Sequence, residues 1–402
     1  MGSSNHSPRP IETVATADGA RIACKRKPSD GPPVIMVHGL AVNADIWDIP
    51  DLDGPDFTYR SLSNELHALG YDVWMMNLRG HGAPHMLSTP PPGQKDWTVD
   101  SFIAYDLPAV VEHVQSVRRE RPWLLGNSMG AMTIAGYLQG ATITENGEPR
   151  VVGAESLAQC RQDRVRGCVL LEFPAALRWP RSLYDASGSL NWDALLREWT
   201  RNDSGANYPF EAMARSWWLR MLLRTSGQVP LRWARGAFEP GAWRESLPQP
   251  LRDALDWTDR QIMNATRRFA EAFKGTKNFQ PETFVKGLLY SADHMKAGVL
   301  EQFAECVRRG AFVSGVGDPP YVYSDHYDRI ACPVLLILGG RDRIANAEIC
   351  REVFYDRIRS EDREIHVFDD IAHGDFEYAP VACEKVYPLI CDWLERRRSE
   401  PP

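Results

Sequence analysis

WLLGNSMGAMTIAGYL, residues 123–138, is an apolar run that turns at a glycine-flanked serine into a second apolar run. Its first residues are typical of a buried strand, and residues 129–138 predict a helix. Gly126 and Gly130 flank Ser128, so little side-chain bulk stands in the way of a sharp turn between strand and helix. A serine on such a turn is strained and exposed at the carboxyl edge of a parallel sheet. We therefore predict that Ser128 is a nucleophile.

Short β-rich runs alternate with helical patterns on both sides of this turn. Such alternation is typical of an α/β fold with a mostly parallel sheet and helices on both faces. The other predicted strands are 34–37, 71–76, 168–171, 333–338 and 364–368, and a last helix is expected from about 382 to 397.

The texture of the sequence changes in the middle of the chain. From about residue 175 to 327, broken helical patterns replace the alternation, and this stretch holds eight of the thirteen tryptophans. We therefore predict a catalytic core in two parts, residues 1–174 and 328–402, interrupted by a mainly helical cap, residues 175–327. The polar segment 141–166 is expected to be a surface excursion.

Composition excludes several classes of function. The net charge is −7 with acidic and basic residues interspersed, which argues against a nucleic-acid binder. No apolar run approaches the roughly 18 residues of a membrane span, and the polar N-terminal residues lack the apolar core of a signal peptide. The eight cysteines form no CxxC pair. We expect a soluble cytoplasmic protein without metal or cofactor, and the sequence leaves its oligomeric state open.

A serine nucleophile needs a base, and that base needs a carboxylate to orient it. His373 and Asp342 each follow a predicted strand, so both should lie at the sheet edge to which Ser128 points. Their order along the chain is serine, acid, histidine. We predict these three residues as a catalytic triad. Glu172 also follows a predicted strand directly and is the alternative acid.

Two backbone N–H groups should stabilise the negative oxygen that forms when a serine attacks a carbonyl group. One is expected from Met129, the residue after the nucleophile. The other is expected from Leu40 in the loop after the first core strand, where Gly39 permits close approach of the backbone. His38 is expected to order this loop through hydrogen bonds.

Four segments resemble a known family: VIMVHGLAVNADIW (34–47), GYDVWMMNLRGHG (70–82), YDLPAVVEHV (105–114) and IAHGDFEYAP (371–380). They are similar to the α/β-hydrolase superfamily, and within it to the acid-lipase-like branch of gastric and lysosomal lipases. The resemblance covers most of residues 30–140 and 320–395. It implies the triad and the oxyanion donors named above.

One position departs from that branch. Asn127 precedes the serine where these lipases usually carry histidine, and the GNSMG elbow also resembles that of meta-cleavage-product hydrolases, which break carbon–carbon bonds with the same triad. Apolar walls over such a site exclude water and bind apolar chains. We predict that Trp47, Asn127, Trp217 and Trp218 line the substrate pocket.

The sequence thus predicts a serine hydrolase that cleaves an ester or thioester of a bulky apolar acyl compound. Two chemistries on the same triad remain as alternatives, carbon–carbon bond hydrolysis and acyl transfer to an alcohol. A third alternative is a non-catalytic ligand receptor on the same fold.

Overall fold

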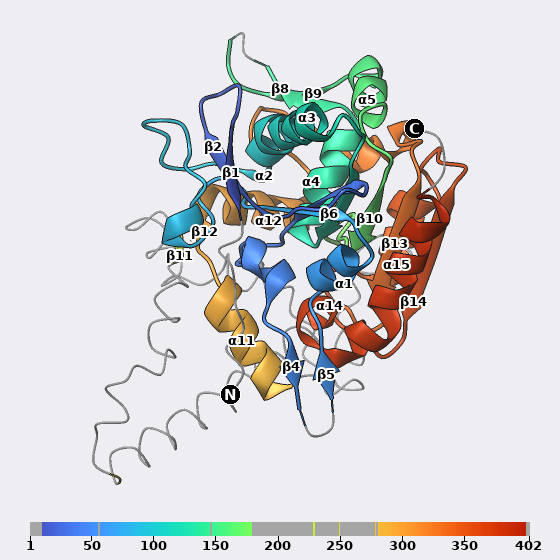
Figure 1. Cartoon of the computed structure of the whole chain (residues 1–402). Helices are drawn as coiled ribbons and strands as arrows, with labels where there is room; N and C mark the ends of the chain where they lie inside the picture. The colour runs from blue at the N-terminus through green and yellow to red at the C-terminus, as the bar shows by residue number, and fades with distance from the viewer. Residues whose placement is uncertain are drawn as a thin grey trace.

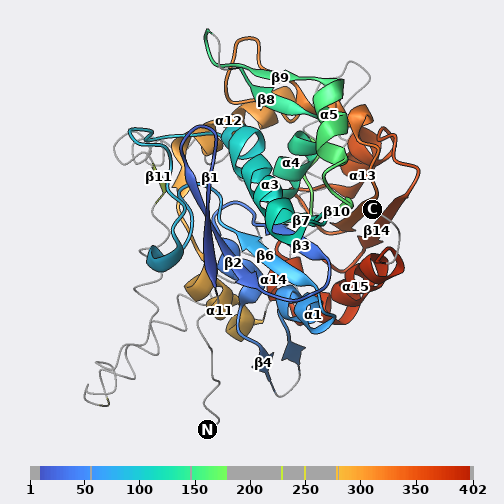
Figure 2. The ribbon, with the colours of Figure 1, turned by 45° about the horizontal axis from the view of Figure 1, so that its top comes forward.

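The computed structural model describes residues 10–54, 57–144, 147–178, 228–229, 249, 278 and 280–398. Their centre is an eight-stranded sheet in the order β1-β2-β6-β3-β7-β10-β13-β14 (Figures 1 and 2). β1 and β2 run antiparallel to their neighbours, whereas all the pairs from β6 to β14 are parallel. The strands are β1 (Ile11–Ala15), β2 (Arg21–Lys27), β3 (Pro33–Val37), β6 (Asp72–Met76), β7 (Trp123–Asn127), β10 (Gly167–Leu171), β13 (Val334–Gly339) and β14 (Arg363–Phe368).

Side chains of each central strand alternate between two apolar clusters, one on each face of the sheet. In β3, Val34 and Met36 pack with side chains of α1 (Leu62–Ala68) and α15 (Tyr387–Arg396). Ile35 and Val37 pack on the opposite face, in a second cluster. The helices of that face are α3 (Leu107–Arg118), α4 (Met129–Leu138) and α12 (Ala297–Arg309). Burial on both faces explains why these strands are continuous apolar runs.

The six strands predicted from the sequence are all confirmed, with ends shifted by two residues at most. The fold class is confirmed with them. The prediction missed β1 and β2, because β2 reads Arg-Ile-Ala-Cys-Lys-Arg-Lys and lacks the apolar run of a central strand. Arg26 instead pairs with the buried carboxylate of Asp72 and lies over the ring of Trp74.

Segment 141–166 is more deeply embedded than the predicted surface excursion. It forms a short hairpin, β8 (Ala141–Ile143) with β9 (Val151–Gly153), and then α5 (Glu155–Gln162). The buried amide of Gln162 donates to the carbonyl groups of Leu138 and Arg329 and accepts from the N–H groups of Ala331 and Cys332. This polar segment therefore contains a buried residue, Gln162, that joins the end of α4 to residues 329–332.

Within the predicted cap, the structure describes residues 175–178, 228–229, 249, 278 and 280–327. α11 (Pro281–Ser291) is followed by β12 (Met295–Lys296), which pairs antiparallel with β11 (Gln228–Val229). α12 then buries Val299 and Phe303 in the same cluster as α4, so the last part of residues 175–327 packs with the core. Residues 179–227, 230–248 and 250–277 lie outside the described residues, and the cap stays a prediction. Across the described ranges, no helix has the length and apolar character to cross a membrane.

Candidate active site

Ser128 lies at a sharp turn between β7 and α4. Its backbone has φ 49° and ψ −117°, a strained conformation for a residue with a side chain. A Cβ atom at Gly130 would stand 2.2 Å from the carbonyl oxygen of Val37, and one at Gly126 would stand 2.7 Å from the carbonyl carbon of Gly130. Both flanking glycines are therefore required by close backbone packing, as the predicted elbow demands.

The structure brings the predicted triad together. Nε2 of His373 lies 3.0 Å from Oγ of Ser128, and Nδ1 lies 2.8 Å from Oδ2 of Asp342. Asp342 and His373 are buried, with exposed fractions of 4% and 6%. The other carboxylate oxygen of Asp342 accepts two 2.8 Å hydrogen bonds, from the N–H groups of Ile344 and Ala345. These bonds hold the carboxylate in place, so it can fix the imidazole tautomer that keeps Nε2 free to accept a proton.

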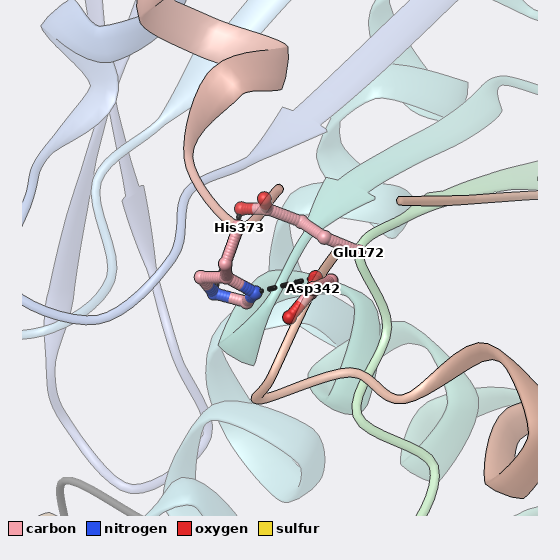
Figure 3. A group of neighbouring side chains, drawn as sticks. All are labelled: Glu172, Asp342 and His373. Carbon is pink, nitrogen blue, oxygen red and sulfur yellow. Dashed lines mark hydrogen bonds and ion pairs between the residues drawn. The ribbon is translucent and has the colours of Figure 1, made fainter. Parts of the chain in front are cut away.

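Glu172, the alternative acid, has another set of partners. It follows β10 with φ 41°, and its Oε2 accepts a 2.6 Å hydrogen bond from the N–H of Gly374. Its Oε1 lies 3.7 Å from Nε2 of His373, beyond hydrogen-bond distance. Figure 3 shows Asp342 at the imidazole ring and Glu172 reaching the backbone of the histidine loop. The geometry therefore favours Asp342 over Glu172 as the partner of Nδ1.

A second carboxyl group, Glu377, lies beside Glu172, and sequence reasoning missed it. The amide nitrogen of Asn127 donates to Oε1 of Glu377 and, at 3.4 Å, to Oε1 of Glu172. Burial raises the pKa of Glu172 well above its usual range, and the neighbouring carboxylates of Glu377 and Asp342 add to the effect. Glu172 therefore binds its proton more tightly than an exposed glutamate does. Glu377 stands four residues after His373, and this spacing alone carried no signal of the contact.

The histidine loop has a further anchor in Asp375, the second residue after His373. Oδ2 of Asp375 accepts hydrogen bonds from the N–H of Ala372, at 2.8 Å, and from Nδ2 of Asn278, at 2.9 Å. Nδ2 of Asn278 also donates to the carbonyl oxygen of Asp370, at 2.7 Å. Asn278, three positions before α11, is thus bonded to the loop that carries the histidine.

Within the described ranges, Glu172, Asp342 and His373 also lie close enough together to hold a metal ion. Their ligand atoms already have protein partners, because Oδ2 of Asp342 pairs with Nδ1 of His373 and Oε2 of Glu172 accepts from Gly374. Asp342 and His373 form a chain of hydrogen bonds that ends at Ser128, which suits proton transfer.

The loop predicted to carry an oxyanion donor lies against the elbow. A Cβ atom at Gly39 would stand 3.4 Å from Cβ of Ser128, so this glycine brings the backbone next to the serine. Met129 is the first residue of α4, and its N–H has no acceptor within the helix. His38 orders the loop as predicted, since Nδ1 lies 2.8 Å from the carbonyl oxygen of Gly39 and Nε2 accepts from the N–H of Leu78.

The predicted pocket residues have different positions. Trp47, in the short 3₁₀ helix Ala44–Asp48, is 2% exposed and packs in the apolar cluster with α1 and α15. Its contribution to a pocket stays a prediction. Asn127 is buried and bonded to the two glutamates, as described above. Trp217 and Trp218 lie outside the described residues.

Comparisons with known proteins agree with this fold. A family model described as the alpha/beta hydrolase fold matches residues 32–193. A thermophilic esterase from Thermogutta terrifontis has a similar solved structure, with a TM-score of 0.51 and 17% identity over 97% of this chain and 100% of that one. At this identity the likeness shows the fold alone.

Among curated relatives, a probable lipase from Schizosaccharomyces pombe is 31% identical over 115 residues, 28% of this chain and 22% of the relative. Triacylglycerol lipase 1 from Arabidopsis thaliana is 31% identical over 129 residues, 30% of this chain and 31% of the relative. Human lipase member M is 30% identical over 145 residues, 33% of this chain and 32% of the relative. The matches thus span about a fifth to a third of these relatives. From its sheet, its elbow and these similarities, the chain has the α/β-hydrolase fold and is similar over part of its length to lipases.

Proposed function

We propose that this protein is a serine hydrolase that cleaves carboxylic esters or thioesters of bulky apolar acyl compounds through an acyl-enzyme. The observation that carries the proposal is the continuous contact from Ser128 through His373 to Asp342. The curated relatives named above are lipases, which supports an ester substrate.

In the first half of the reaction, Nε2 of His373 accepts the proton of the Ser128 hydroxyl group while Oγ attacks the carbonyl carbon of the ester. The imidazolium that forms is stabilised by the carboxylate of Asp342, 2.8 Å from Nδ1. His373 then gives its proton to the leaving alcohol or thiol as the bond to the acyl carbon breaks. The acyl group is left on Oγ of Ser128.

In the second half, a water molecule takes the place of the leaving alcohol. His373 removes one of its protons, the oxygen attacks the acyl carbon, and the proton passes to Oγ of Ser128 as the acid departs. The N–H groups of Leu40 and Met129 donate to the oxyanion in both halves. A group of this kind contributes roughly 100- to 1,000-fold to kcat.

Carbon–carbon hydrolysis and acyl transfer use the same serine and histidine, and the elbow residue Asn127 is shared with the former class. Ester cleavage is preferred here because of the lipase relatives. A non-catalytic receptor has no need of a strained serine bonded to a buried histidine, and the observed geometry therefore favours an enzyme. The cytoplasmic location expected from the sequence stays a prediction.

The test combines turnover with labelling. We expect the protein to hydrolyse p-nitrophenyl esters and to react covalently with a fluorophosphonate at Ser128, and Ser128→Ala should abolish both. Loss of a triad member costs on the order of a million-fold in kcat. The matched control is Ser116→Ala. Among the described residues, the hydroxyl group of Ser116 bonds only to the carbonyl oxygen of His113. Labelling of another serine, or near-normal turnover by Ser128→Ala, would remove the basis of the proposal.

A further inference from the structure

The segment after α11 forms hydrogen bonds with the oxyanion loop, residues 39–43. The N–H of Asn43 donates to the carbonyl oxygen of Ser291, and the N–H of Asp293 donates to the carbonyl oxygen of Ala41, both at 2.8 Å. Val42 and Ala292 form an antiparallel bridge between these two bonds. The loop is therefore held as a short strand by residues almost 250 positions away in the sequence.

The side chain of Asp293 adds a third segment to this junction. It is fully buried, and its Oδ2 accepts hydrogen bonds from the N–H of Gly82, at 2.7 Å, and from Nδ2 of Asn43, at 3.3 Å. Its Oδ1 accepts from the N–H of His294, at 2.7 Å. One carboxylate thus joins the oxyanion loop, the turn after β6 and the end of α11. A buried carboxylate that accepts several N–H groups is firmly placed, because each lost bond leaves a buried donor unsatisfied.

The loop needs such support because its backbone is strained. Ala41 has φ 67°, the left-handed region that residues with a side chain rarely adopt. Ala41 directly follows Leu40, the expected oxyanion donor, and its carbonyl oxygen is the acceptor for Asp293. Strained residues persist where surrounding contacts determine their conformation. Loss of the Asp293 contacts would allow Ala41 to relax and would turn the neighbouring peptide groups.

We infer that Asp293 is a positioning residue that fixes the oxyanion loop and, through it, directs the N–H of Leu40 at the reacting carbonyl oxygen. This inference rests on the proposed ester hydrolysis and on Leu40 as a donor. The hydrogen bonds of Asp293 described above go to the oxyanion loop, to Gly82 and to His294, and none of them goes to Ser128 or His373. Its effect is therefore on the transition state, in which the oxyanion exists, and not on binding of the neutral ester.

The first test is Asp293→Asn in the full chain. An amide keeps one oxygen acceptor and places an N–H₂ group against either Gly82 or His294, so one of these bonds is lost. We expect kcat to fall by about 10- to 100-fold, which is no more than the fall caused by removing one oxyanion donor. KM should change by less than about threefold.

The second test measures the affinity for a trifluoromethyl ketone, which would not change if Asp293 only stabilised the fold. The ketone adds to the serine as an oxyanion-bearing hemiketal, so its affinity should fall by the same factor as kcat/KM. The matched control is Asp100→Asn, because Asp100 is also buried and accepts from Gln302, Tyr323 and two N–H groups remote from the oxyanion loop. This control should lower Tm and leave kcat and ketone affinity within about twofold.

Asn43→Ser is a milder variant in case Asp293→Asn does not fold. Serine can still accept from the N–H of Asp45, as Asn43 does, but it lacks the amide that donates to Asp293. It should lower kcat and ketone affinity together, by a smaller factor. If the wild-type protein is active and the folded variants keep its kcat and ketone affinity, this inference is wrong and the proposed function stands. A wild-type protein that neither hydrolyses esters nor reacts with the fluorophosphonate would overturn the proposed function and this inference with it.

Discussion

Gly374 directly follows the histidine of the site, and its N–H donates a 2.6 Å hydrogen bond to the carboxyl group of Glu172. Glu172 thus supports the backbone of the histidine loop, whereas Asp342 contacts the imidazole itself. Two acids that both stand at strand ends beside one histidine have separate tasks in this arrangement.

A kinetic comparison of two isosteric variants tests that division. Asp342→Asn should lower kcat by about four orders of magnitude, because an amide favours the wrong imidazole tautomer. Glu172→Gln should lower it less than about tenfold, since the amide oxygen still accepts from Gly374. Circular dichroism spectra establish that both variants are folded. The opposite ranking of kcat would make Glu172 the acid of the triad.

Glu172 should also leave a mark on the pH dependence of stability. Its pKa is raised in the folded protein, chiefly by burial, from an ordinary value of 4.5. Above pH 4.5 the unfolded chain therefore binds fewer protons than the folded one, so the free energy of unfolding falls as pH rises toward the folded-state pKa. Glu172→Gln cannot ionise and should remove this slope, so its Tm should gain on the wild-type value between pH 5 and 8. Exposed Glu148→Gln is the control, and parallel Tm curves for all three proteins would contradict the prediction.

His38 should act in the opposite sense. Burial, with a contribution from neighbouring His81, lowers its pKa to about 3. Below the ordinary value of about 6.5, the unfolded chain binds a proton that the folded chain does not, so stability falls as pH falls from about 6.5 toward 3, by up to about 1.4 kcal/mol per pH unit. His38→Gln should be less stable at pH 7 and show a shallower loss in acid, measured by urea unfolding. Exposed His67→Gln should follow the wild-type protein; an equally steep acid loss in His38→Gln would rule out this assignment.

Substrate selectivity tests the role of the predicted cap, residues 175–327. Activity should rise with acyl bulk beyond acetate if apolar side chains form the pocket. Trp217→Ala or Trp218→Ala should then alter the ratio of kcat/KM for large and small esters by about 1–3 kcal/mol, the usual discrimination of an apolar pocket. Trp393→Ala, in the core on the opposite side of the sheet from α4, is the control and should affect stability without changing the ratio. A flat chain-length profile, untouched by the cap variants, would assign the cap a purely structural role.

The sequence predicted those features that depend on residues close together in the chain. Apolar strand runs located six strands, and the glycines around Ser128 located the elbow, because each pattern reports the backbone of its own segment. Asp342 and His373 were predicted to lie near Ser128 because parallel strands end at one edge of the sheet. The bonds of His373 to Ser128 and to Asp342 agree with that placement.

The contacts that the sequence did not predict join segments far apart in the chain. Asn127 meets Glu377 across 250 positions, and Asp293 meets Gly82 across 211. No periodicity marks a residue whose task is to accept hydrogen bonds from a distant loop. The charged strand β2 was missed for a related reason, since Asp72 on another strand neutralises its Arg26 and no local apolar pattern is needed.

The two ends of α11 define a junction for chain exchange between related hydrolases. Asn278, three positions before the helix, bonds to the loop of His373, and Asp293, two positions after it, bonds to the loop of Leu40. A chimera that replaces only residues 179–277 keeps both attachments of its host. A chimera whose downstream crossover lies beyond residue 294 replaces the residues that bond to both loops. Its new substrate selectivity would then come with displaced positions of His373 and Leu40. The productive crossover for transplanting a new specificity therefore lies before Asn278.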